Sequence, residues 1–186
     1  MNRILCALAA AVLAPSAALA QSPTQTLNVT GEVAPACVLG TPSNATLTIG
    51  SLSGADGRLL PALAGSAPAA QTAINNAWCN TPSNITLTAS PLSMVTPPVY
   101  AQQAGFSRSI TYSADLTNWS GPVSNRPLTA GNAVTVAAAG AQAAAPSLGV
   151  VFSKLTPLVN GAETPTAFIE AGAYTATISV SLAAAS

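Results

Sequence analysis

The side chains best suited to covalent chemistry in this sequence are its cysteines, Cys6, Cys37 and Cys79. Cys37 and Cys79 each open a similar stretch, in which a Pro-Ser-Asn turn is followed by alternating polar and apolar residues. Cys6 lies in an apolar N-terminal run that we expect to be removed. The remaining even pair predicts one disulfide in an oxidising compartment, with two buried free thiols as the alternative. A Cys37–Cys79 bond would close a loop of roughly 40 residues and stabilise the fold by about 4 kcal/mol.

Catalytic residue patterns are missing from the sequence. It has no histidine, which excludes Ser-His-Asp triads, Cys-His pairs and the usual zinc sites. It also lacks a Gly-rich phosphate loop and a Gly-x-Ser-x-Gly motif. Carboxylates are few and scattered, although sequence distance alone leaves open that Asp115 and Glu163 meet in space. We therefore predict that the protein is not an enzyme and uses no cofactor or metal.

Aromatic side chains are the remaining candidates for a ligand site, because a ring can stack on a sugar. The candidates are Trp78, Tyr100, Tyr112, Trp119 and Tyr174. Trp78 stands beside Cys79, and Tyr112 and Tyr174 lie in alternating stretches, so we expect these three in the core. Tyr100 and Trp119 fall in Pro- and Gly-containing loops, where binding residues are often found. They are the candidate ligand aromatics of a carbohydrate-binding module.

The first twenty residues have the pattern of a signal peptide. A basic start at Arg3 precedes an apolar run over 4–13, and Ala18-Leu19-Ala20 fits a cleavage signal. The apolar run is too short to span a bilayer, and later apolar runs are interrupted by polar residues. We expect a mature chain without a membrane span that begins near Gln21. It would pass through the periplasm and reach the cell surface or the medium.

The charge balance argues against nucleic-acid binding. The whole sequence has five basic and five acidic residues, and loss of Arg3 with the signal peptide leaves four against five. No basic cluster is present to neutralise phosphates. Low net charge, with many Ser, Thr, Asn and Ala residues, suits a subunit that packs against copies of itself.

Alternation of polar and apolar residues with a period of two recurs along the mature chain and predicts β-strands. It is clearest after Gly172, where one face comprises Tyr174, Ala176, Ile178, Val180 and Leu182. Other strands are predicted at 26–33, 45–52, 71–78, 84–89, 107–114, 133–139 and 147–153. A loop or one irregular helical turn is predicted at 59–70, and a loop at 137–145. Turn residues separate the strands, and no convincing amphipathic helix appears. The pattern predicts an all-β fold, an antiparallel β-sandwich with one disulfide.

Several segments resemble bacterial pilus subunits of the chaperone–usher type, including the spore coat protein U-like branch. Gly31-Glu32-Val33 stands just before Cys37, and the second cysteine follows about forty residues later at the end of a strand. The closing stretch 172–182 and the Tyr-containing stretch 110–115 are similar to strands of this family. The resemblance spans most of the mature chain.

This resemblance implies an immunoglobulin-like, pilin-type sandwich over 34–186 that is incomplete because its last strand is missing. A periplasmic chaperone fills the resulting groove until an N-terminal extension of another subunit replaces it, with an outer-membrane usher guiding export. Here the extension, or first strand, would be 21–33, with Leu27 and Val29 as the donor side chains. The acceptor edge would be the strand that contains Tyr174, Ala176, Ile178, Val180 and Leu182. The implied function is a structural subunit of a pilus, fimbria or coat, built from copies of itself or related subunits and used in cell adhesion.

Overall fold

The computed structural model describes residues 26–119, 121–129, 131–137 and 147–185. The signal peptide expected at 1–20, residues 21–25 of the extension and nearly all of the predicted 137–145 loop lie outside the described residues. The chain divides into an N-terminal unit, Met1–Val33, and a larger unit, Ala34–Ser186.

We call residues 21–33 the extension. Its described part is residues 26–33. These residues belong to no strand. Leu27 and Val29 are each 87% exposed, and Val33 is 83% exposed. The prediction of a half-buried strand here is therefore wrong for the isolated chain. The alternation is present, but no described strand pairs with these residues, and a strand requires a hydrogen-bonding neighbour.

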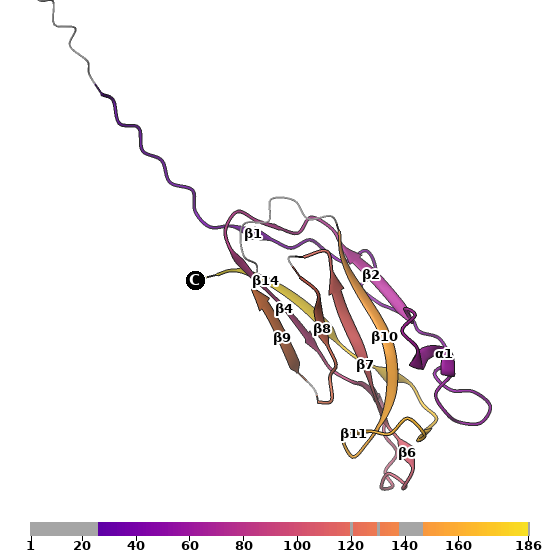
Figure 1. The fold of residues 1–186 in the computed structure, drawn as a ribbon. Helices are drawn as coiled ribbons and strands as arrows, with labels where there is room; N and C mark the ends of the chain where they lie inside the picture. Colours follow the sequence, from indigo (N-terminus) through magenta and orange to yellow (C-terminus); the bar gives the residue numbers. More distant parts are fainter. Residues whose placement is uncertain (1–25, 120, 130, 138–146, 186) are drawn as a thin grey trace, which may run out of the picture. The chain divides into compact units, whose positions relative to one another are not determined.

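The larger unit, which we call the domain, is built almost entirely of short strands (Figure 1). In chain order the described elements are β1 (Cys37–Val38), α1 (Pro61–Ala64), β2 (Ala70–Ile74), β3 (Trp78–Cys79), β4 (Ser83–Ala89), β5 (Leu92–Met94), β6 (Phe106–Ser107), β7 (Ser109–Thr117), β8 (Val123–Asn125), β9 (Asn132–Ala137), β10 (Leu148–Val159), β11 (Ala162–Glu163), β12 (Phe168–Ile169), β13 (Tyr174–Thr175) and β14 (Ile178–Ala184). The all-β prediction is confirmed. No helix in the described ranges is long and apolar enough to cross a membrane.

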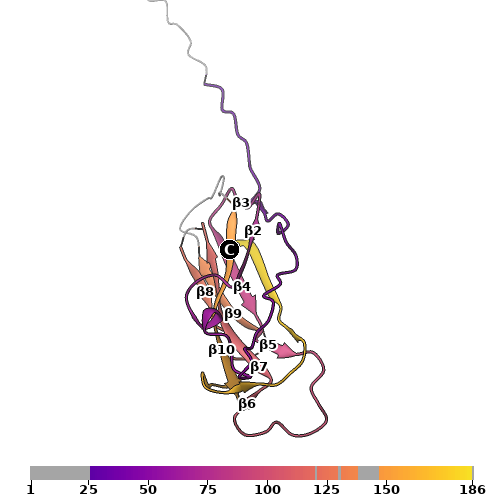
Figure 2. The same cartoon turned by 90° about the vertical axis from the view of Figure 1, so that its right-hand side faces the viewer.

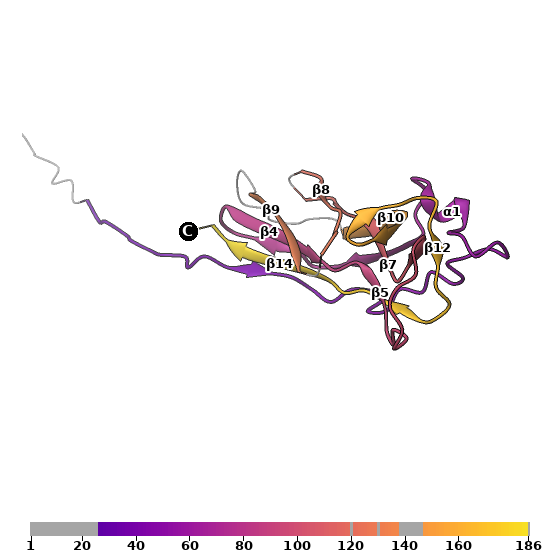
Figure 3. The ribbon, with the colours of Figure 1, turned by 90° about the horizontal axis from the view of Figure 1, so that it is seen from below.

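Two sheets form most of the domain. The larger has the order β11-β10-β7-β5-β13, with β2 also pairing with β10 and β8 with β7. The smaller has the order β14-β4-β9, and its strands are seen side by side in Figure 3. The short pairs β1–β3 and β12–β6 lie outside these sheets. Of the described pairs, β12–β6 is parallel and the others are antiparallel.

Both sheets contribute to one hydrophobic core, which gives the domain a sandwich-like arrangement. Ile85 and Leu87 of β4 are fully buried in this core, as is Tyr112 of β7. The Tyr112 ring stacks on Phe152 of β10 with 3.8 Å between ring centroids, and its hydroxyl donates to the Ser90 carbonyl at 2.7 Å. The expectation that Tyr112 belongs to the core is confirmed.

The predicted disulfide is present. Cys37 and Cys79 lie directly opposite one another in the β1–β3 pair, and their sulfurs are 2.09 Å apart. Asn80 holds the chain beside the disulfide, since its Nδ2 donates to the Ala34 carbonyl at 3.0 Å and its Oδ1 accepts from the Ala36 amide at 2.7 Å. The disulfide therefore marks the point where the extension leaves the domain.

Several predicted strand boundaries shift. The strand predicted at 147–153 is β10 and continues to Val159, past an irregularity between Ser153 and Thr156 where Lys154 has a φ of 52°. The strand predicted after Gly172 is interrupted at 176–177, giving β13 and β14. The stretch 45–52 forms no strand beyond an isolated bridge at its C-terminal side. The stretch lies along one side of a groove, where 45–51 have no backbone hydrogen-bond partner among the described residues.

Candidate strand-binding groove

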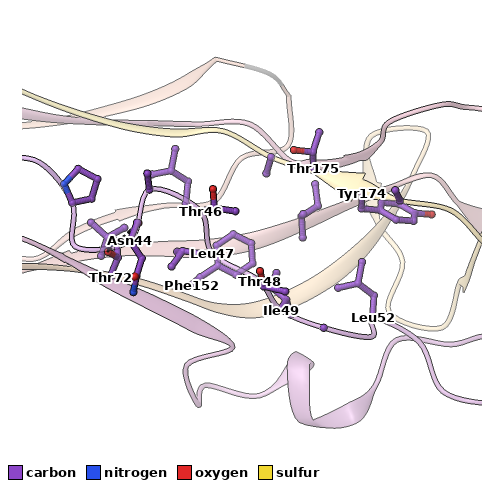
Figure 4. Close-up of a pocket in the computed structure, with 18 of the residues that line it drawn as sticks. Asn44, Thr46, Leu47, Thr48, Ile49, Leu52, Thr72, Phe152, Tyr174 and Thr175 are labelled. Atoms are coloured by element: carbon purple, nitrogen blue, oxygen red, sulfur yellow. Dashed lines mark hydrogen bonds between the residues drawn. The ribbon is translucent and has the colours of Figure 1, made fainter.

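A groove of about 1030 Å³ runs along one side of the domain. One side of it is formed by β13 and β14, the other by residues 44–53, and its floor by side chains of β2, β5 and β10. Figure 4 shows Leu47 and Ile49 on one side and Tyr174 and Thr175 on the other, with Phe152 next to Leu47. The groove is open, with a lining of both apolar and polar side chains.

The first side of the groove is an unpaired strand edge. β14 pairs with β4 from Ile178↔Ala89 to Ala184↔Ser83, and no described strand pairs with its other edge. Its apolar side chains alternate with exposed hydroxyls, and Ile178, Val180 and Leu182 pack only partly against the core. An edge of this kind presents unpaired backbone donors and acceptors that another strand can use.

The second side of the groove, residues 44–52, is an extended segment that we call the rail. At its start, the Asn44 amide donates to Thr72 Oγ1 at 3.0 Å, next to the bridge between Pro42 and Ile74. Beyond it, no backbone–backbone hydrogen bond among the described residues involves 45–51. Leu47 and Ile49 are nevertheless half-buried while Thr46 and Thr48 are exposed. The predicted alternation is therefore correct, and the missing strand character reflects a missing partner.

The floor of the groove is apolar and consists of core side chains from the larger sheet. Ile74 is 6% exposed, Leu92 6%, and Val150 and Phe152 4% each. These residues come from β2, β5 and β10, so the floor is fixed by the hydrogen bonds of that sheet. A strand placed between the rail and β14 would bury every second side chain against this floor.

Tyr174 lines the groove near one end and is linked to a buried ion pair. Its hydroxyl donates to the Glu170 carbonyl at 2.8 Å. The Glu170 carboxylate accepts from Arg108 Nε at 2.8 Å, while its other oxygen is buried without a hydrogen-bond partner among the described residues. Burial, together with the nearby Glu170 charge, raises the pKa of Tyr174 to about 12. Tyr174 therefore keeps its proton, and its hydrogen bond, well above neutral pH.

Arg108 extends this link to the loop at residues 95–105. Its Nη2 donates to the Tyr100 carbonyl at 3.0 Å, and its guanidinium carbon lies 5.1 Å from the centre of the Tyr100 ring. The ring is 55% exposed. The end of the groove and this loop are thus held together by Glu170 and Arg108.

The predicted acceptor residues largely coincide with the groove. Tyr174, Ala176, Ile178 and Val180 line it, and Leu182 lies farther along β14 on the same face. The predicted donor residues, Leu27 and Val29, belong to the other unit and are exposed.

The two candidate ligand aromatics do not form one site. Tyr100 is held at the start of β7 by Arg108, whereas Trp119 follows the end of β7, and nine strand residues between them span about 30 Å. Trp119 is only 8% exposed and belongs to the core cluster. Trp119, a candidate ligand aromatic from its place in a Pro- and Gly-containing loop, is thus a core residue in the structure.

Sequence reasoning missed the rail, the floor and the ion pair. The signal for the rail was available, since residues 44–48 (Asn-Ala-Thr-Leu-Thr) nearly repeat residues 84–88 (Asn-Ile-Thr-Leu-Thr). The partnership of Arg108 with Glu170, 62 residues apart, has no local signal.

Comparison of the chain with protein-family models, with curated proteins and with solved structures found no significant match.

Proposed function

We propose that this chain is a structural subunit of a secreted surface fibre or coat, and that it assembles by donation of its extension to the groove of another copy or a related subunit. In this proposal the domain is an incomplete immunoglobulin-like sandwich of the pilin type. A periplasmic chaperone occupies the groove during export, and an outer-membrane usher passes the subunit on to the cell surface. The protein then acts without catalysis.

One observation carries the proposal: the groove lies between two strand-like backbones that lack a partner facing it. β14 has a free edge, and 45–51 make no backbone–backbone hydrogen bonds among the described residues. One inserted strand could pair with β14 and with the rail, while its apolar side chains cover the floor. Main-chain hydrogen bonds would supply affinity, and the pockets for alternate side chains would supply specificity.

The extension has the pattern that such a strand needs. Leu27, Val29 and Val33 alternate with polar residues, and Gly31 lies on the same face between Val29 and Val33. Four groove-lining positions of the acceptor edge also alternate, from Tyr174 to Val180. An antiparallel register then gives the pairs Leu27–Val180, Val29–Ile178, Gly31–Ala176 and Val33–Tyr174.

The antiparallel direction follows from the point where the extension leaves the domain. That point lies beside the disulfide, at the end of the domain where β14 ends, because Ala185 donates to the Pro82 carbonyl and Asn80 holds Ala34. A donor running parallel to β14 would bring its own domain to this occupied end. An antiparallel donor leaves the groove at Tyr174 instead, which gives an open head-to-tail chain.

A gel run without boiling tests the proposal on the full chain, expressed with its export machinery. Strand-exchanged polymers should give a ladder that collapses on heating. Leu27→Asp should remove the ladder, because the carboxylate would have to be buried unpaired on the groove floor. Asn28→Asp is the matched control, since the neighbouring side chain faces away from the floor and the ladder should persist.

Deletion of residues 21–30 separates donation from acceptance. The shortened chain should form no polymer, yet it should still co-purify with a groove-binding chaperone because its groove is intact. Polymers that survive both Leu27→Asp and the deletion would refute donation by the extension.

A monomeric carbohydrate-binding module is the alternative function. It would use Tyr100 and Trp119, but the burial of Trp119 and the separation of the two rings count against a shared sugar site. A single monomer band in the medium, together with glycan binding lost on Tyr100→Ala, would favour this alternative.

A further inference from the structure

The exposed large hydrophobic residues of the described chain fall into two groups. Of nine such residues, four belong to or closely follow the extension: Leu27, Val29, Val33 and Val38. Four others lie within twelve residues of one another: Val95, Val99, Tyr100 and Phe106. Leu128 stands apart. Exposed apolar side chains that gather on one surface mark interaction sites, and donation of the extension accounts only for Leu27, Val29 and Val33.

The second group lies on residues 95–106, which we call the mouth loop, at one end of the groove. The Val95 amide donates to the carbonyl of Ala173, a groove-lining residue, at 2.9 Å. A second cavity of about 400 Å³ lies between Tyr100, Phe106 and residues 169–171, and Glu170 and Ala171 also line the groove. The mouth loop therefore continues the groove beyond Tyr174.

The mouth loop and the disulfide lie at opposite ends of the domain. Figures 1 and 2 place β6, which follows this loop, far from β1 and β3, and Figure 2 shows the loop itself projecting beyond β5 and β6. Val38 thus belongs to one end of the domain and Val99 to the other. These two ends meet when identical copies are joined head to tail.

We propose that the mouth loop of one copy binds residues 33–38 of the next copy, forming a second contact beside the donated strand. The inference rests on the proposed function, because the donated strand brings the two ends together. With Val33 opposite Tyr174, the following five residues can extend at most about 17 Å beyond the groove. That reach extends past the Val95–Ala173 hydrogen bond, where the mouth loop begins next to Tyr174.

The chemistry of the two surfaces also matches. Residues 33–38 are Val-Ala-Pro-Ala-Cys-Val and carry no charge. The mouth loop offers Val95, Val99 and the rings of Tyr100 and Phe106, and the charges of Arg108 and Glu170 behind it neutralise each other. A second copy is therefore the occupant that this uncharged apolar surface fits. The contact would fix how neighbouring domains are arranged in the polymer.

Photocrosslinking in the assembled polymer tests the contact directly. A photoreactive residue at Val99, whose side chain is fully exposed, should crosslink to residues 33–38 of another copy. A mixture of isotopically heavy and light chains distinguishes crosslinks between copies from those within one chain. The same residue placed at Leu128 is the control and should give no crosslink to 33–38. Polymers that crosslink elsewhere, or not at all, from position 99 would refute the contact.

Assembly measurements give a second readout. Val99→Asp should lower the fraction of chain in polymers at a fixed concentration at least ten-fold, whereas Leu128→Asp should leave it unchanged. If Leu27→Asp abolishes polymers while Val99→Asp has no effect, the second contact is wrong and strand donation stands. A full chain that remains monomeric overturns both.

Discussion

The Glu170 carboxylate and the Arg108 guanidinium form an ion pair of 2.8 Å between two segments that are 62 residues apart in sequence. Glu170 receives the Tyr174 hydroxyl on its backbone carbonyl, and Arg108 binds the Tyr100 carbonyl. The pair therefore joins the end of the groove to the mouth loop. Its side chains are only 7% and 16% exposed, so solvent screens it little.

Removing the carboxylate should destabilise the domain. Glu170→Gln leaves Arg108 without its counter-ion and should lower the free energy of unfolding. Glu163→Gln is the matched control, because its pair with Arg126 is more than one-third exposed and should contribute less than about 1 kcal/mol. Urea unfolding of both variants measures the difference. Equal losses would show that Glu170 has no special role.

The direction of side chains on β14 can be tested with two neighbouring substitutions. Val180→Asp places a carboxylate on the groove face, so a peptide of residues 26–33 should bind at least ten-fold more weakly, because binding would bury the charge. Ser181→Asp places the same charge on the exposed face and should leave binding unchanged. Titration of the extension-deleted chain with the peptide measures both. Equal weakening by the two variants would argue against insertion beside β14.

Loss of the disulfide should be costly. The Cys37→Ala/Cys79→Ala variant loses a bond with a sequence separation of 42, for which chain entropy predicts about 4 kcal/mol less stability. Denaturant unfolding of the variant measures the loss. Treating the native chain with a reductant should produce a similar change, and no change in either case would show that the bond does not stabilise the fold.

Stability should decline at alkaline pH through Tyr174. Its pKa is about 12 in the fold, against 10 for an unperturbed tyrosine, so the folded state holds this proton more tightly than the unfolded state. The stabilisation is complete below pH 10 and is lost as the pH rises from 10 to 12.

The measurement for this prediction is the free energy of unfolding as a function of pH in the native chain and in Tyr174→Phe. The variant should decline less steeply over the same range. Some decline should remain, because burial also raises the pKa of Tyr112. Identical slopes in the two proteins would exclude Tyr174 as a source.

Residues 84–88 and 44–48 show what the sequence determined and what it left open. Both stretches alternate polar and apolar residues after a Pro-Ser-Asn turn; Ile85 and Leu87 are buried and Leu47 is half-buried, whereas Ala45 is exposed. The strand at 84–88 becomes β4, paired on both sides with β14 and β9, whereas 44–48 forms one side of a groove. Side-chain alternation is a local property, but pairing depends on which backbone lies alongside.

The same difference between local patterns and long-range contacts separates the other features that the sequence predicted from those that it did not. The sequence by itself determined the all-β character, the Cys37–Cys79 pairing and the face shared by Tyr174, Ile178 and Val180, because these follow from periodicity and from an even cysteine count. Only the tertiary structure decided that β14 is an edge strand, that Trp119 is buried and that Glu170 meets Arg108. Each of these depends on contacts between residues distant in the chain, whose geometry no local pattern encodes.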